Sequence, residues 1–186
     1  MKETEKNILI AATKLFSEQG YNGVSTRKIA EQAGVNEITL FRYFKSKSNL
    51  LQAVIKHFAY EGNIIEKLSK EVTGDIKQDV KIFADVYYMF LHNNIKMYLI
   101  QTREIELESK RFTNTIDYTE FMKRYFTNKK VEGTFTGDPL LVATSIVSMI
   151  MGIFTLNVYA PDIYHDTDYK LLIQRFVEDL TRLYCI

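Results

Sequence analysis

The sequence predicts an all-α protein in which three short N-terminal helices precede a larger helical domain. The 186 residues include only 8 Gly and 2 Pro, whereas sandwiches and barrels need many turns rich in these residues. Apolar residues recur at helical spacing from the N-terminus onward. Residues 1–56 hold 9 Lys and Arg against 5 Asp and Glu, and residues 57–186 hold 15 against 18. This asymmetry is typical of a basic domain that meets a polyanion, although chance clustering of solvated charges gives the same counts.

The first two helices follow from apolar spacing and from their end signals. Within residues 8–16, apolar side chains occupy positions i, i+3, i+4, i+7 and i+8, which is one face of a helix. Gly20 is expected to end this helix, because glycine accepts the left-handed backbone found after helix ends. Ser25 is a good N-cap for a second helix that turns Ile29 and Ala30 inward.

A third short helix and a longer fourth are predicted next. Gly34 favours a tight turn, and Asn36 caps a helix with Leu40, Phe41 and Phe44 on its apolar side. The fourth helix starts near Lys47, and its apolar face consists of Leu50, Leu51, Val54, Ile55 and Phe58. A four-residue hinge with small residues, between two short helices, indicates a helix-turn-helix, although many helical bundles contain such corners.

Five further helices are expected, at 75–92, 94–108, 113–127, 139–158 and 168–184. The polar, Gly-containing segment 128–137 is expected to be a loop. Asp138 followed by Pro139 is a strong helix start, with an acidic cap and proline at the first helical position. The very apolar segment 139–160 contains Ser, Thr and Asn and lacks flanking basic residues, so we expect a buried helix rather than a membrane span.

The sequence is expected to belong to a cytoplasmic protein. Its single cysteine, Cys185, permits no intramolecular disulfide, which fits a reducing compartment. The charged N-terminus precedes an apolar run that Thr13 and Lys14 interrupt, so no signal peptide is expected.

Residues 25–47 closely resemble the signature of the TetR family: they include Ile-Ala, Ala-Gly-Val, Thr-Leu-Phe, Tyr-Phe and Ser-Lys at the family's spacing. Ala12, Leu15, Phe16, Gly20 and Tyr21 match its first helix. The resemblance implies a helix-turn-helix DNA-binding domain at 1–46 and a helical regulatory, ligand-binding and dimerisation domain at 47–186. It also implies a ligand-responsive transcriptional regulator, a repressor that binds a palindromic operator as a homodimer and is released by a small apolar or aromatic effector. Its partners would be double-stranded DNA, a second copy of the chain and the effector, with no membrane and no cofactor.

The resemblance places the DNA contacts on the second and third predicted helices and at the start of the fourth. The candidate DNA-binding residues are Thr26, Arg27, Asn36, Glu37, Ile38, Thr39, Phe41, Arg42, Tyr43 and Lys47. Arginine can hold a guanine bidentately, glutamate can accept from cytosine, isoleucine can touch a thymine methyl, and hydroxyls and lysine suit phosphates. The family usually has a small residue at Ile38 and tyrosine at Phe41, so the base preference is expected to differ. For Arg27, Arg42, Glu37 and Lys47 an ordinary solvated surface is the alternative.

The middle of the chain is rich in aromatic residues and Met, which suit a cavity for an apolar or aromatic ligand. The candidate pocket residues are Phe83, Tyr87, Phe90, Tyr98, Tyr118, Phe121 and Met122. An ordinary helical core is the alternative for each of them. In the family the last two helices pair across a two-fold axis, and small residues permit close approach there. The candidate dimer-interface residues are Ser145, Ser148, Gly152, Phe176 and Leu180.

An enzyme is the competing class, and the sequence offers little for it. The three histidines, at 57, 92 and 165, are far apart, and no metal-ligand or nucleophile motif appears. Glu104, Glu106 and Glu108 alternate, so a helix would turn them to different faces. We expect no catalytic residue and no metal site. A purely structural helical module would explain the packing but not the basic motif.

Overall fold

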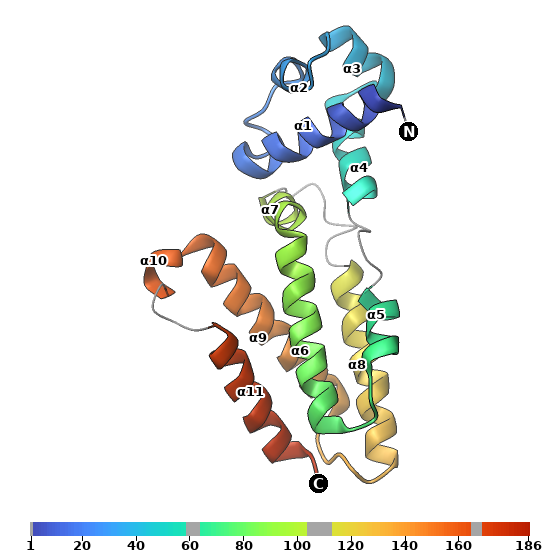
Figure 1. The fold of residues 1–186 in the computed structure, drawn as a ribbon, viewed down its shortest axis with the longest axis vertical. Coiled ribbons are helices and arrows are strands. Elements are labelled where there is room, and N and C mark those ends of the chain that lie inside the picture. Colours follow the sequence, from blue (N-terminus) through green and yellow to red (C-terminus); the bar gives the residue numbers. More distant parts are fainter. Residues whose placement is uncertain (1, 59–63, 104–112, 165–168) are drawn as a thin grey trace. The chain divides into compact units, whose positions relative to one another are not determined.

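The computed structural model describes residues 2–58, 64–103, 113–164 and 169–186, and it consists of helices joined by short connections (Figure 1). The all-α prediction is confirmed. In chain order the helices are α1 (Glu3–Gln19), α2 (Thr26–Gln32), α3 (Glu37–Phe44), α4 (Lys47–Phe58), α5 (Ile64–Glu71), α6 (Ile76–Asn93), α7 (Ile95–Arg103), α8 (Thr113–Val131), α9 (Pro139–Tyr159), α10 (Pro161–Tyr164) and α11 (Tyr169–Tyr184).

The helices form two compact units. The N-terminal unit combines Met1–Glu61 with Asn94–Arg111, and the C-terminal unit combines Gly62–Asn93 with Phe112–Ile186. By packing, α4 and α7 therefore belong with the first three helices, although α7 comes from the middle of the sequence. The predicted boundary between residues 46 and 47 separates a DNA-binding part from a regulatory part. Because helix packing does not test these functions, the boundary stays a prediction.

The N-terminal unit has one hydrophobic core to which all five of its helices contribute. Predicted inward positions on α1 to α4 are confirmed for its most buried members, which are Ile8, Ala12, Leu15, Phe16, Ile29, Ala30, Leu40, Leu50 and Val54; the side chain of Phe58 lies outside the described part of the chain. Helix α7 adds Met97 and Ile100 to the same core. The predicted inward position of Phe41 is wrong, because 41% of this residue is exposed. Full burial of an apolar side chain contributes about 1.5–3 kcal/mol to the free energy of unfolding. Leu40 and Phe44, which are buried, therefore hold α3 in the core.

The turn between α1 and α2 depends on two glycines. Gly20 ends α1 with φ 74° and ψ 161°, a backbone conformation that is nearly restricted to glycine. A Cβ atom at Gly23 would lie 2.5 Å from the carbonyl oxygen of Gln19. The prediction that Gly20 stops the first helix is confirmed.

The C-terminal unit is a bundle in which α6 and α9 make most of the helix contacts. Helix α6 packs against α5, α9 and α11, while α9 also packs against α8, α10 and α11 (Figure 1). The connection after α8 is tied to the C-terminus, because the N–H of Thr136 donates to the carbonyl of Tyr184 (2.9 Å) and that of Ile186 donates to Thr134 (3.1 Å).

A buried carboxylate anchors the connection between α5 and α6. Asp79 is fully buried, and it accepts hydrogen bonds from the N–H and hydroxyl of Thr73 (2.7 and 2.8 Å) and from the N–H of Gly74 (2.9 Å). Its fourth donor is the hydroxyl of Tyr125 on α8, at 2.6 Å. Burial, and then the hydrogen bond to Asp79, raise the pKa of Tyr125. Asp79 thus joins the α5–α6 connection, α6 and α8 through one carboxylate.

One sequence prediction of helix bounds needs correction, and two helices were not predicted. Helix α8 continues to Val131, so the first part of the predicted loop 128–137 is helical. Lys129 and Lys130 lie in the last turn of α8, where the helix dipole favours cations. The segment was predicted to be a loop because its composition is polar. Helices α5 and α10 were not predicted. The predicted helix 94–108 is present as α7, and its residues 104–108 lie outside the described part of the chain.

Helix α9 is long and apolar enough to cross a membrane by length and composition alone. The mean hydropathy of its most apolar window is 2.0, and 39% of that window is buried. The prediction of a buried helix is correct for one face only, because Leu140, Leu141 and Leu156 are exposed. An apolar face remains on this helix after the C-terminal unit has folded.

Candidate DNA-binding surface

Helices α2 and α3 are held in place by the two caps that the sequence predicts. The Ser25 hydroxyl accepts from the N–H of Lys28 at 3.2 Å, and the Asn36 side chain accepts from the N–H of Ile38 at 2.9 Å. Between them Gly34 has φ 69°, and the N–H of Val35 donates to the carbonyl of Ala30 at 3.0 Å. The hinge is thus a compact turn in which the N–H groups of Ala33, Gly34 and Val35 are hydrogen-bonded. Helix α3 starts where the Asn36 cap places it.

The inner and outer faces of α3 differ sharply in chemistry. Leu40 and Phe44 point into the core, with exposed fractions of 0% and 7%. Ile38 and Phe41 are exposed by 76% and 41%, and Arg42 is exposed as well. The outer face therefore presents apolar bulk together with a cation. This combination is suited to the edges of bases.

A hydrogen bond joins the N-terminal ends of α2 and α3. The Thr26 hydroxyl donates to the carboxylate of Glu37 at 2.6 Å. Both residues belong to the predicted set of DNA contacts, and in this structure they are hydrogen-bonded to each other. The Asn36 side-chain oxygen is likewise used by the cap, which leaves its amide N–H groups for other partners.

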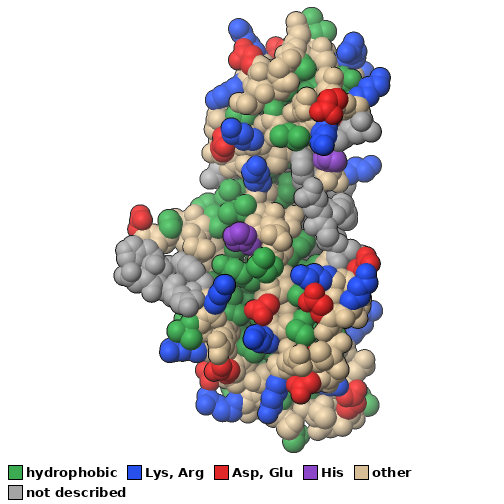
Figure 2. Space-filling model, viewed as in Figure 1, with side chains coloured by type: hydrophobic (Ala, Val, Ile, Leu, Met, Phe, Trp, Pro, Cys, Tyr) green, Lys and Arg blue, Asp and Glu red, His purple; other side chains and the backbone are tan. Residues whose placement is uncertain are grey.

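The cations of α2 and α4 lie on the same unit as the outer face of α3. Arg27 pairs with Glu31 at 3.1 Å, but both side chains are well exposed, at 79% and 64%, and such surface pairs hold weakly. The Lys47 ammonium lies 4.2 Å from the centre of the Tyr21 ring, which fixes the side chain at the start of α4. In the view of Figure 2, basic side chains lie along both edges of this unit with acidic ones among them, and both kinds are also interspersed over the C-terminal unit.

Lys45 is a candidate contact that sequence reasoning missed. It lies between α3 and α4 with φ 67° and ψ −38°, and the N–H of Ser46 donates to the carbonyl of Phe44 at 2.8 Å. This is a γ-turn of the rare kind with positive φ at its central residue. The Ser46 hydroxyl then accepts from the N–H of Asn49 at 3.1 Å and caps α4. The run Lys-Ser-Lys just after the third helix could have indicated a second lysine next to Lys47 as a phosphate contact.

The ten predicted contact residues all lie on α2, on α3, at the cap between them or at the start of α4. Helix α3 packs against both α2 and α4. The structure thus gathers the whole predicted set within one compact unit. Whether these residues touch DNA stays a prediction.

The predicted pocket residues are divided between the units. Tyr98 lies on α7 in the N-terminal unit, and the other six lie on α6 and α8 in the C-terminal unit. Phe83, Tyr87, Tyr118 and Met122 are fully buried. The rings of Tyr87 and Tyr118 stack with their centres 4.7 Å apart, and the Tyr118 hydroxyl donates to the carbonyl of Phe83.

Two of these residues retain partly open side chains. Phe90 stacks on Tyr87 with ring centres 6.5 Å apart, and Phe121 contacts Phe83 edge to face at 6.2 Å; both are half-buried. Burial raises the pKa of Tyr118 well above its usual range, so its phenol stays protonated. The centre of this set is therefore a packed aromatic core, with Phe90 and Phe121 at its margin.

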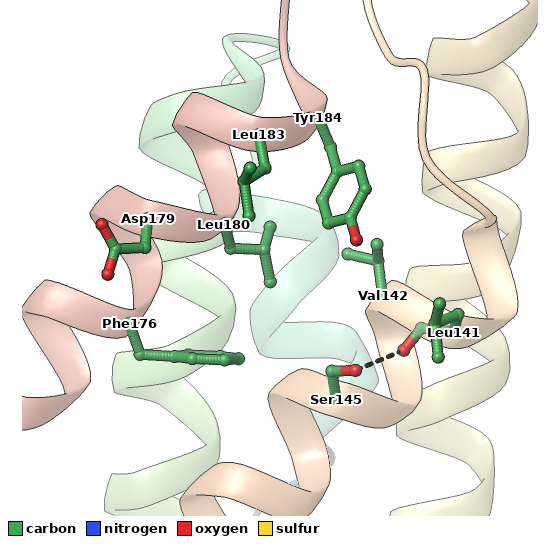
Figure 3. Close-up of a pocket in the computed structure, with 8 residues that line it drawn as sticks. All are labelled: Leu141, Val142, Ser145, Phe176, Asp179, Leu180, Leu183 and Tyr184. Atoms are coloured by element: carbon green, nitrogen blue, oxygen red, sulfur yellow. Dashed lines mark hydrogen bonds between the residues drawn. The ribbon is translucent and has the colours of Figure 1, made fainter.

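A shallow groove of about 330 Å³ lies between α9 and α11. In Figure 3 the side chains of Phe176 and Leu180 on α11 project toward α9, whereas the Asp179 carboxylate points away. The lining residues are Leu141, Val142, Ser145, Phe176, Asp179, Leu180, Leu183 and Tyr184. The groove brings together three predicted dimer residues, namely Ser145, Phe176 and Leu180. Its rim is apolar and exposed, at 58% for Leu141 and 68% for Leu183.

The other two predicted dimer residues lie further along α9. Ser148 is exposed. A Cβ atom added at Gly152 would meet no atom within 4 Å. The protomer itself therefore does not require glycine at this position.

Comparison with known proteins agrees with the geometry of α1 to α4. Residues 8–54 match the family model described as bacterial regulatory proteins, tetR family. The chain is 29% identical over 168 residues to the uncharacterized HTH-type transcriptional regulator YvkB of Bacillus subtilis (strain 168), with 87% of each chain covered.

Two solved structures share the fold over nearly their whole length. NalD, the secondary repressor of the MexAB-OprM multidrug efflux pump in Pseudomonas aeruginosa, has a TM-score of 0.73 at 18% identity, with 98% of this chain and 95% of NalD covered. SmeT, in complex with triclosan, has a TM-score of 0.72 at 18% identity, with 100% and 93% covered. At these identities the likeness establishes the fold.

Proposed function

Because this chain is a DNA-binding transcriptional regulator of the TetR family, we propose that it is a cytoplasmic repressor released from DNA by a small effector. It binds a palindromic operator as a homodimer, and an apolar or aromatic molecule held in the C-terminal unit weakens that binding. The chain is a regulator and not an enzyme. The observation that carries the proposal is the outer face of α3, where exposed Ile38, Phe41 and Arg42 stand on a capped, firmly packed helix.

Sequence reading is assigned to α3 and positioning to its neighbours. Arg42 and Ile38 face base edges in the major groove, together with Phe41 and Glu37. Thr26, Thr39, Tyr43 and Lys47 contact phosphates, while Arg27 reaches a phosphate or a base edge. Asn36 contributes mainly by capping α3. Phosphate contacts of this kind orient the helix, and the base contacts select the sequence.

The homodimer is assigned to α9 and α11. The groove between them is apolar and open, and exposed leucines continue from it along both helices. A second copy related by a two-fold axis would cover this surface with the same surface of its own. Ser145, Ser148, Gly152, Phe176 and Leu180 would lie in that interface. Two recognition helices would then meet successive major-groove faces, about 34–36 Å apart.

The effector is assigned to the aromatic residues of α6 and α8. SmeT is a structural neighbour that was solved with triclosan, a chlorinated aromatic compound, and NalD is a repressor. Since Phe83, Tyr87, Tyr118 and Met122 are fully buried here and the rings of Tyr87 and Tyr118 stack, an effector must enter beside Phe90 and Phe121 and displace rings. Tyr98, the remaining predicted pocket residue, lies on α7 in the N-terminal unit and is not part of this assignment.

A ligand titration tests the effector assignment. Triclosan and other apolar aromatic compounds would be screened by thermal shift, and each hit titrated with and without saturating operator. A hundredfold preference of the effector for the DNA-free protein corresponds to about 2.7 kcal/mol of coupling. By reciprocity, operator must weaken effector binding by the same factor. A hit whose affinity is the same with and without operator is not an effector.

Selection of binding sites from randomised duplexes tests DNA binding and the palindrome together. The enriched sequences should contain two inverted half-sites, and the mass of the complex should correspond to dimers on DNA. Enrichment of single half-sites by a protein that remains monomeric at micromolar concentration would overturn the homodimer.

A further inference from the structure

Helix α3 presents two large apolar side chains to solvent on its outer face. Ile38 is exposed by 76% and Phe41 by 41%. They are three residues apart, so they lie next to each other on the helix surface. We call this pair the α3 apolar strip.

The fold of the protomer does not account for the strip. Helix α3 is held by Leu40 and Phe44, which belong to the core of the N-terminal unit, whereas Ile38 and Phe41 do not. A single exposed apolar residue is ordinary, but here two are neighbours on the helix to which the proposed function assigns the reading of bases.

The charges around the strip identify the chemistry of its partner. Between residues 25 and 47 there are five Lys or Arg and two Asp or Glu. One of these two acids, Glu37, is bonded to Thr26, and the other, Glu31, is paired with Arg27. A partner that suits both cations and apolar side chains is a polyanion with an apolar feature. In the major groove of DNA that feature is the C5 methyl group of thymine.

We propose that the α3 apolar strip reads thymine methyl groups and thereby specifies thymine in each half-site of the operator. The inference rests on the proposed function, because it concerns what α3 selects once it lies in the groove. Three residues advance about 4.5 Å along a helix, and base pairs stack at about 3.4 Å. Ile38 and Phe41 therefore reach methyl groups on the same or adjacent base pairs.

The DNA provides a test that needs no change to the protein. On a selected operator, each thymine would be replaced in turn by deoxyuridine, which lacks the methyl group but keeps every hydrogen-bonding group. At one or two thymines per half-site the replacement should weaken binding about three- to tenfold, as expected for one buried methyl group. At the same positions 5-methylcytosine should bind more tightly than cytosine, because it restores the methyl.

Variants of the protein then assign the methyl to the strip. In Ile38→Ala or Phe41→Ala, the deoxyuridine effect at the matching position should vanish, as in a double-mutant cycle. Ile10→Ala is the matched control, since Ile10 is also an exposed apolar residue of the same unit, at 48%, but lies on α1. It should leave the effect intact. Folding is checked by circular dichroism, and both strip residues are exposed enough for alanine to be tolerated.

The failures of the inference and of the proposed function are distinguishable. If the protein enriches no sequence at all, DNA reading itself fails. If it enriches an operator on which no deoxyuridine weakens binding, only the methyl inference is overturned. A deoxyuridine effect that persists in both alanine variants overturns it too. A kink in the bound DNA that depends on Phe41 but not on methyl groups would also overturn the inference, because Phe41 would then insert between base pairs instead of contacting a methyl group.

Discussion

Lys45 occupies a turn whose backbone is unusual for an L-residue. Its φ of 67° and ψ of −38° keep α3 and α4 only two residues apart. Strain of this kind costs about 1–3 kcal/mol and persists where surrounding contacts impose it, often at functional sites. Here the cap that follows, at Ser46, starts α4 and places Lys47 beside the ring of Tyr21.

Replacement of Lys45 separates the strain from the charge. Lys45→Gly should raise the free energy of unfolding by about 1 kcal/mol, because glycine adopts positive φ without strain. Lys45→Ala keeps the strain and should change stability little. Both variants lose the same charge, so both should weaken operator binding and lower the salt slope by about one unit. Urea unfolding and binding titrations measure these effects, and a glycine variant less stable than the alanine variant would contradict the account.

Asp79 is the second residue whose position decides local structure. It is fully buried and accepts four hydrogen bonds, from Thr73, Gly74 and Tyr125. Removal of an acceptor from such a group leaves buried donors without partners. The apolar periodicity of α6 could not reveal this, since periodicity places an aspartate on a face but does not supply its donors.

The Asp79 carboxylate should contribute measurably to stability. Asp79→Asn should lower the free energy of unfolding by about 2–3 kcal/mol, and Tyr125→Phe by about 1–2 kcal/mol, because hydrogen bonds to a charged group are involved. Asp85→Asn, at an exposed position on the same helix, should stay within about 0.5 kcal/mol of the wild type. Thermal and urea unfolding measure all three. Equal effects at Asp79 and Asp85 would show that the four hydrogen bonds contribute nothing.

Among the elements, the starts of α2, α3 and α9 were predicted best. Ser25 and Asn36 both cap the helices that they were expected to cap, because capping is a local interaction that sequence alone determines. The predicted start at Pro139 is also confirmed, and the Asp138 side chain accepts from the N–H of Leu141 at 2.7 Å.

The features that the sequence did not reveal depend on long-range packing. Phe41 was expected inside, but Leu40 and Phe44 already fill the inner face of α3. The affiliation of α7 with the N-terminal unit depends on contacts with α1, far away in sequence. For the aromatic residues of α6 and α8 the sequence left open both a cavity and an ordinary core; Phe83, Tyr87 and Tyr118 are fully buried, and the pocket stays a prediction. Composition predicts that such residues gather, but not how much space remains between them.

Helix α9 provides a test of the dimer at the level of an element. Gly152→Phe should leave the protomer folded, because a Cβ there meets no atom within 4 Å, and should block close approach of a second copy. Gly152→Ala is the control, which adds one methyl group and should remain dimeric with about 1 kcal/mol more helix stability. Analytical ultracentrifugation compares the variants at micromolar concentration. A phenylalanine variant that dimerises as tightly as the wild type would place the interface elsewhere.

At the scale of the whole molecule, the chain folds into two compact units, each built from two separate segments of the sequence. The chain passes between them three times, after residues 61, 93 and 111. Helix α7 belongs to the N-terminal unit, whereas α6, its neighbour in the sequence, carries the candidate effector residues Phe83, Tyr87 and Phe90. The proposed release from DNA therefore has a short covalent route from one unit to the other, between Asn93 and Ile95.

The central claim is that the outer face of α3 reads an operator. Its most direct test is the affinity for a selected operator divided by that for a scrambled duplex, at fixed salt, in three proteins. The wild type should prefer the operator by about a thousandfold or more. Arg42→Ala should lose about 1–3 kcal/mol on the operator, while Arg124→Ala, at an exposed position on α8, should match the wild type. Equal affinity of the wild type for both duplexes, or equal losses in the two arginine variants, would contradict the account.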